Sequence, residues 1–139
     1  MKIRQGFVTN SSSSSYIIAV KGGLNNIKNL VDVENKVWKD FIINSILALL
    51  NSGDPDGCDE TRPATVYIGS KNDLDEYKSD NFESADEAEK NPLFAKFKKH
   101  LKDGYIIYNK RVGYNDSSTG EQLRKTFEGN PNFVILEVY

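Results

Sequence analysis

Runs of apolar residues alternate along the chain with polar stretches, and their spacing predicts both strands and helices. Gly22 and Gly23 end the first apolar run, and the last run is apolar through most of its length, as expected of a strand with both faces covered. Short runs of β-branched and aromatic residues predict strands over residues 16–20, 65–69, 105–114 and 132–139.

The longest predicted helix covers residues 31–51. Near its end the helix is apolar almost all round, so we expect its second half to be buried on more than one side. Two interpretations stay open: a central helix of the core, or a helix that completes its burial in a dimer or against a partner. Apolar residues recur in it at helical spacing in two series: Val37, Phe41 and Ala48, and Trp38, Ile42, Ile46 and Leu49.

Capping residues mark the starts of the remaining helices, which are expected after Ser70, Ser84, Asn91 and Ser118. Helices therefore alternate with strands, and this order predicts an α/β fold. We expect about four strands in a mostly parallel or mixed sheet with helices packed on it. Residues 1–15 are expected to form a serine-rich lead segment, and residues 16–139 a single domain.

The composition of the chain is that of a folded domain that neither spans a membrane nor carries a large net charge. The chain has 139 residues, of which 38% are hydrophobic and 27% charged, so it can form a core and is not of the disordered class. Its net charge of -2 gives no overall attraction to nucleic acid or to an anionic membrane. The longest apolar region, residues 41–50, is too short to span a bilayer, and no signal peptide is visible. We expect a cytoplasmic protein with no membrane partner.

Residue types that commonly carry catalysis are scarce. A single cysteine, Cys58, excludes an internal disulfide, and together with a single histidine, His100, it argues against a structural zinc site. We find no P-loop, no Gly-x-Gly-x-x-Gly and no His-Glu-x-x-His pattern. No carboxylate is paired locally with His100, so we interpret it as a surface residue of a basic helix. We therefore expect no catalytic residue and no cofactor.

An acidic loop follows the long helix, where the helix carboxyl end adds partial negative charge. Its carboxylates are hard oxygen ligands of the kind that calcium and magnesium prefer, although the spacing is not that of an EF-hand. A weak metal site and a solvated loop are both open interpretations. The residues concerned are Asp54, Asp56, Asp59 and Glu60.

Charge is segregated in the middle of the chain: residues 73–89 are mostly acidic among their charged positions, and residues 96–111 are mostly basic. The simpler interpretation is a solvated face that the acidic segment partly neutralises. The alternative is a patch that binds phosphate or nucleic acid, in which tyrosines at 105, 108 and 114 would stack on bases. The basic residues of that patch would be Lys96, Lys99, Lys102, Lys110 and Arg111.

A tract of consecutive serines stands close to the start of the sequence, within the stretch "GFVTNSSSSSY". Serine hydroxyls and backbone amides could bind an anion, but a solvated loop or spacer is the simpler interpretation, and a recognition or processing signal is a further alternative. The residues that stand out are Gly6, Phe7, Val8, Asn10, Ser11, Ser12, Ser13, Ser14, Ser15 and Tyr16.

This stretch resembles an N-terminal signature, "GFVSNSSSSSF", that recurs at the start of otherwise dissimilar uncharacterised proteins of tailed bacteriophages and some bacteria. Thr9 stands where the signature has Ser, and Tyr16 where it has Phe. The resemblance covers about the first 18 residues. It implies a phage origin and a shared handling step, such as recognition by a protease or a modifying enzyme, or sorting into a virion.

The expected function is that of a phage accessory protein that binds another protein and catalyses nothing. Its partner would be a host factor or a virion component, in the host cytoplasm or in the virion, and a homo-oligomer is a further option. The alternative is a small nucleotide- or nucleic-acid-binding protein, including an enzyme, that uses the basic segment 96–111.

Overall fold

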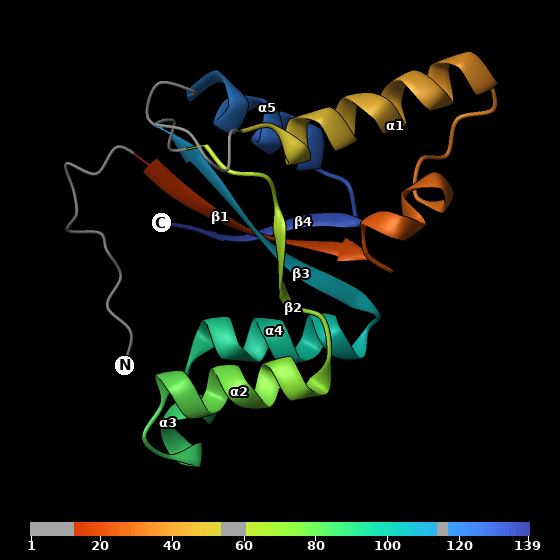
Figure 1. The fold of residues 1–139 in the computed structure, drawn as a ribbon. Coiled ribbons are helices and arrows are strands. Elements are labelled where there is room, and N and C mark those ends of the chain that lie inside the picture. The colour runs from red at the N-terminus through yellow and green to blue at the C-terminus, as the bar shows by residue number, and fades with distance from the viewer. Residues whose placement is uncertain (1–12, 54–60, 114–116) are drawn as a thin grey trace.

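The computed structural model describes residues 13–53, 61–113 and 117–139. Strands and helices alternate in it much as the sequence predicts (Figure 1). In chain order the elements are β1 (Ser13–Lys21), the 3-10 helix η2 (Leu24–Asn29), α1 (Lys36–Asn51), β2 (Thr65–Ile68), α2 (Lys71–Asn81), α3 (Ala85–Glu89), α4 (Pro92–Lys102), β3 (Tyr105–Gly113), α5 (Ser117–Phe127) and β4 (Phe133–Val138).

The four strands form one sheet in the order β2-β3-β1-β4, and each neighbouring pair is antiparallel. The prediction of an α/β fold is confirmed, but the prediction of a mostly parallel or mixed sheet is wrong. Two of the helical connections do join strands that run in the same direction, as the alternation predicts: β1 runs parallel to β2, and β3 runs parallel to β4. The members of each pair are not neighbours in the sheet. A strand of opposite direction lies between the members of each such pair. This is the connectivity of the split β-α-β motif, applied twice.

Helices cover both faces of the sheet (Figure 1). Helices η2, α1 and α5 lie on one face, while α2, α3 and α4, inserted between β2 and β3, cover the other. The central strand β1 is buried on both sides, and its side chains alternate between two apolar clusters. Ile18 and Val20 belong to the cluster beneath α1 and α5, whereas Ile17 and Ala19 belong to the cluster above α4.

The second cluster is rich in aromatic residues. Phe97 of α4 is fully buried, and its ring makes edge contacts with Tyr67 at 6.0 Å and with Tyr77 at 5.1 Å between centroids. Tyr77 also stacks on Phe94. Through these ring contacts α2 and α4 pack against each other and against strand β2.

Predicted helix caps are confirmed where the structure describes them. The side chains of Ser70, Ser84 and Asn91 each accept a hydrogen bond from the backbone amide three residues on. Other boundaries differ: β1 begins at Ser13 rather than at Tyr16, and α1 begins at Lys36 rather than at residue 31. Helix α5 begins at Ser117, so Ser118 lies inside its first turn and is not the cap.

Within the described residues, no helix has both the length and the apolar character that crossing a bilayer requires.

Candidate protein-binding site

Three large apolar side chains stand exposed on the first half of α1. Val37 is 78% exposed, and Trp38 and Phe41 are each 60% exposed. The rings of Trp38 and Phe41 meet edge to face, with centroids 5.9 Å apart. We call these three residues the apolar α1 surface.

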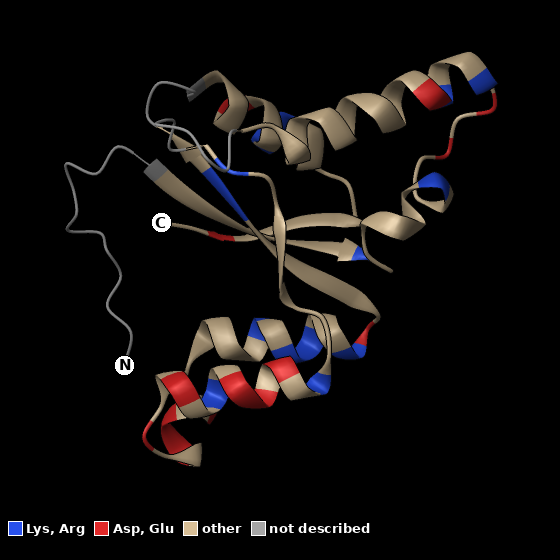
Figure 2. Ribbon diagram, viewed as in Figure 1, with Lys and Arg blue, Asp and Glu red and all other residues tan. Residues whose placement is uncertain are grey.

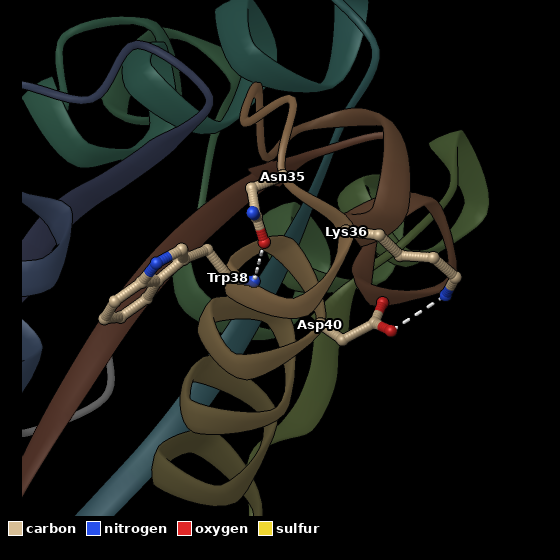
Figure 3. Close-up of polar contacts among 4 residues, drawn as sticks. All are labelled: Asn35, Lys36, Trp38 and Asp40. Atoms are coloured by element: carbon tan, nitrogen blue, oxygen red, sulfur yellow. Dashed lines mark hydrogen bonds and ion pairs between the residues drawn. The ribbon is translucent and has the colours of Figure 1, made fainter.

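The start of α1 is fixed by a side-chain cap and an ion pair (Figure 3). Asn35 accepts a hydrogen bond from the Trp38 amide at 3.0 Å, and Lys36 Nζ donates to Asp40 Oδ2 at 2.9 Å. The hydrogen bond and the charge of Asp40 raise the pKa of Lys36. Figure 3 shows the indole of Trp38 on one side of this turn and the ion pair on the other. The apolar α1 surface therefore has a charged border.

The second half of α1 packs against the sheet along one side. Ile43, Ile46 and Leu50 are buried there, whereas Ser45 and Ala48 stay exposed on the opposite side. The flanking apolar residues Ile42, Leu47 and Leu49 are partly buried. Helix α1 thus belongs to the core through one side and leaves the other to solvent.

A groove of about 400 Å3 lies beside the apolar α1 surface. The groove combines segments that are far apart in the sequence: the stretch before α1, the flank of α1 and the end of α5 with the turn into β4. Its lining is mainly apolar, with polar groups from each segment. The lining residues are Leu30, Val31, Asp32, Val33, Phe41, Ile42, Ser45, Ile46, Leu49, Gln122, Thr126, Asn130 and Phe133.

Lys110, predicted as part of a basic surface patch, is fully buried. It extends from β3 toward the end of α1, where Nζ donates to the carbonyl of Ser52 at 2.6 Å, to Ser52 Oγ at 3.0 Å and to the carbonyl of Arg62 at 2.8 Å. Ser52 is the residue that ends α1, so a cation from the sheet lies where the helix carbonyls carry partial negative charge. Lys110 therefore contributes to holding the end of α1 against the sheet, and it is not part of a basic surface patch.

The other basic residues of the predicted patch do not gather around Lys110. Lys96, Lys99 and Lys102 lie exposed on α4, on the opposite face of the sheet from the Lys110 side chain, and Arg111 is exposed in β3. Helix α4 lies beside the acidic helices α2 and α3, as Figure 2 shows, and Lys98 forms an ion pair with Glu89 at 3.0 Å.

The aromatic residues of that segment are also engaged in packing. Tyr108 is buried, and its hydroxyl accepts a hydrogen bond from the Leu24 amide at 2.8 Å. The hydroxyl of Tyr105 donates to the Pro131 carbonyl, and its ring meets that of His100 with centroids 5.1 Å apart. His100 Nδ1 lies 2.8 Å from the Lys96 carbonyl, which can only accept, so the proton sits on that nitrogen. Tyr114 lies outside the described residues.

Several predicted positions fall outside the described part of the chain. The acidic loop with Asp54, Asp56, Asp59 and Glu60 is one of them, and Gly6 through Ser12 of the N-terminal signature are another. Ser13–Ser15 lie in β1, where the backbone of Ser15 pairs with Tyr139 in both directions. In the described ranges there is no group of three or more metal-ligating side chains placed to hold an ion.

The sequence analysis identified the α1 residues but missed both the groove and the burial of Lys110. The groove joins segments that no local pattern connects. For Lys110 a signal exists: it occupies the same alternating row of β3 as Ile106, Tyr108 and Val112, which point toward the cluster beneath α1. Comparison of this chain with models of known protein families, with curated protein sequences and with solved structures found no match.

Proposed function

We propose that this chain acts by binding another protein through the apolar α1 surface and the groove beside it. The observation that carries the proposal is the 60% exposure of both Trp38 and Phe41 next to a groove of about 400 Å3. Contiguous exposed apolar residues are uncommon on monomeric proteins and mark interaction sites. Tryptophan is among the residues that most often dominate the binding energy of an interface.

Burial of this surface by a partner would favour binding. Full burial of one large apolar side chain contributes roughly 1.5–3 kcal/mol, and three such side chains stand together here. The groove would take an apolar side chain or a short apolar segment of the partner, while polar groups such as Asp32 and Gln122 in its lining would fix the orientation.

The resemblance of the first 18 residues to a bacteriophage signature supports a phage accessory protein. Under this proposal the partner is a host factor or a component of the virion, and the protein acts in the host cytoplasm or the virion. Nothing in the proposal requires catalysis or a cofactor.

The alternative, binding of nucleic acid through segment 96–111, has less support. Lys110 is buried against carbonyl groups, and Tyr108 is buried with its hydroxyl engaged. The remaining exposed lysines of α4 lie beside acidic helices, which lowers their attraction for phosphate.

An affinity capture with matched variants tests the proposal. The tagged full chain is used to capture proteins from infected or producing cells, alongside Gln122→Arg, which places a long charged side chain in the groove, and Asn72→Arg, which makes a similar change on α2. We expect one protein captured in stoichiometric amount by the wild type and by Asn72→Arg, and lost with Gln122→Arg. Equal capture by both variants would exclude the groove. Capture of nucleic acid, falling steeply with salt, would support the alternative.

A further inference from the structure

The exposed side of α1 carries a regular row of positions. Val37, Phe41, Asn44, Ala48 and Asn51 follow one another at alternating steps of four and three residues, and all are exposed. This spacing averages 3.5 residues, the period at which two helices can stay in contact along their length. No charged residue occupies the row. We call these five positions the α1 seam.

Side-chain size changes along the seam. Its first half carries the large residues Val37 and Phe41, with Trp38 on the flank, and its second half carries Ala48, with Ser45 on the same flank. From this gradient we infer that the occupant of the seam is a second copy of the chain, whose α1 packs against the first in the antiparallel direction. Two copies related by a two-fold axis near Asn44 bring each Phe41 over the Ala48 of the other copy.

An antiparallel pair fits this gradient and a parallel pair does not. In a parallel pair each Phe41 would meet its own equivalent, and the two Ala48 residues would face each other across a gap. Close packing of helices requires large side chains to fit over small ones. In the antiparallel pair Asn44 lies at the axis, where two equivalent amides can hydrogen-bond and fix the register.

The charges at the helix ends favour the same direction. α1 has no acidic residue in its first turn, so its own sequence does not compensate the positive end of its macrodipole, whereas the buried Lys110 already lies at the negative end. An antiparallel neighbour places the positive end of one helix beside the negative end of the other. The exposed apolar half of each α1, which extends away from the sheet in Figure 1, is covered at the same time.

The expected area predicts a reversible dimer. Helix α1 has 16 residues, which corresponds to a length of about 24 Å. A contact strip of this length and one helix wide, about 10–12 Å, is small compared with the roughly 1,200–2,000 Å2 that stable complexes bury. We therefore expect a dissociation constant of about 1–100 µM.

This inference rests on the proposed function to the extent that Val37 and Phe41 belong both to the seam and to the apolar α1 surface, and Phe41 also lines the groove. In the dimer, the other partner would bind through the groove and Trp38. Gln122 lies on α5, away from the seam, so Gln122→Arg tests the groove alone. If Gln122→Arg loses partner capture while the wild type stays monomeric at every concentration, the dimer is overturned and the proposed function still stands. A dimer that captures nothing would support the seam and overturn the proposed function.

Sedimentation of the full chain over a range of concentrations gives the first measurement, with the emission of Trp38, the single tryptophan, as a second readout. We expect the mass to double with concentration and the tryptophan emission to shift to shorter wavelength. Ala48→Glu places a carboxylate opposite Phe41 of the other copy and should raise the dissociation constant at least tenfold. Ala95→Glu makes the same change at an exposed position of α4 and should leave the constant unchanged. A monomer at every concentration, or equal effects of the two variants, would overturn the inference.

Cross-linking determines the direction of the pair. In a Cys58→Ser background, Asn44→Cys places the two thiols near the axis, whereas Val37→Cys places them about 20 Å apart along the helix direction. A bismaleimide shorter than two helical turns, about 11 Å, should therefore link Asn44→Cys into a dimer and leave Val37→Cys unlinked. Efficient linkage of both variants would indicate a parallel pair, and linkage of neither would exclude pairing through the seam.

Discussion

Gly120 of α5 lies directly against the hydroxyl of Tyr16 in β1, and this contact leads to a prediction that two substitutions test. A Cβ built on Gly120 would lie 2.3 Å from the Tyr16 hydroxyl oxygen and 3.2 Å from the ring carbon that bears it. The first distance is a severe overlap, while the second requires only a small adjustment. Gly120→Ala should therefore be costly only while the hydroxyl is present.

The magnitude follows from two opposing effects. Replacing glycine by alanine in a helix ordinarily stabilises by about 1 kcal/mol. Overpacking in a core costs roughly 1–3 kcal/mol. Gly120→Ala should thus lower the free energy of unfolding by roughly 0–2 kcal/mol in the wild type. In Tyr16→Phe the same change should stabilise by up to about 1 kcal/mol.

Urea unfolding of the wild type, the two single variants and the double variant measures the coupling between the two sites. We expect a coupling free energy of roughly 1–3 kcal/mol. If Gly120→Ala has the same effect in both backgrounds within about 0.5 kcal/mol, the close packing of α5 on β1 is refuted. Tyr16→Phe is expected to fold, because the signature that the N-terminal stretch resembles carries Phe at this position.

Three further predictions concern other parts of the molecule. Lys110→Met should lower the free energy of unfolding by about 3 kcal/mol or more, because buried carbonyls lose their donor, whereas Lys99→Met at an exposed site should change it by less than about 0.5 kcal/mol in urea titrations. Asn35→Ala should lower the free energy of unfolding by about 1 kcal/mol, because the Trp38 amide loses its hydrogen-bond acceptor. Hydrogen exchange of the Trp38 amide should become faster, and an unchanged exchange rate would argue against the cap. Burial, with smaller effects from neighbouring tyrosines, raises the pKa of Tyr67, so the folded state favours the neutral phenol. Its contribution to stability should be complete below about pH 10 and fall above it, and urea midpoints should fall less steeply there in Tyr67→Phe; an identical slope would contradict the assignment.

Strands and helix caps could be predicted because their signals are local. Ser70, Ser84 and Asn91 each bond to a backbone amide three residues away, so their role depends on the adjoining sequence alone. Whether neighbouring strands run parallel or antiparallel could not be predicted in this way. Alternation of helices and strands sets the relative direction of β1 and β2, but the insertion of β3 between them depends on contacts with distant parts of the chain.

The candidate site was only partly predictable, because part of it depends on local sequence and part on contacts with distant segments. The apolar periodicity of α1 identified Val37 and Phe41 as residues that share a side, and it left open whether the core or a partner covers them. Which side faces the sheet depends on α5 and on the residues before α1. Lys110 was assigned to a surface patch because its charge was given more weight than its place in the alternating row of β3.

The position of β1 in the middle of the sheet has a consequence for biosynthesis. Of the four strands β1 is translated first, yet Ile18 pairs with Tyr108 in β3 and Ile135 in β4, which are translated last. Until the ribosome has released β3, β1, which is buried on both faces in the folded sheet, has no neighbouring strand and can associate with other chains. The sheet can therefore be completed only after β4 has been synthesised, and a chaperone that shields β1 during translation should increase the yield of native protein.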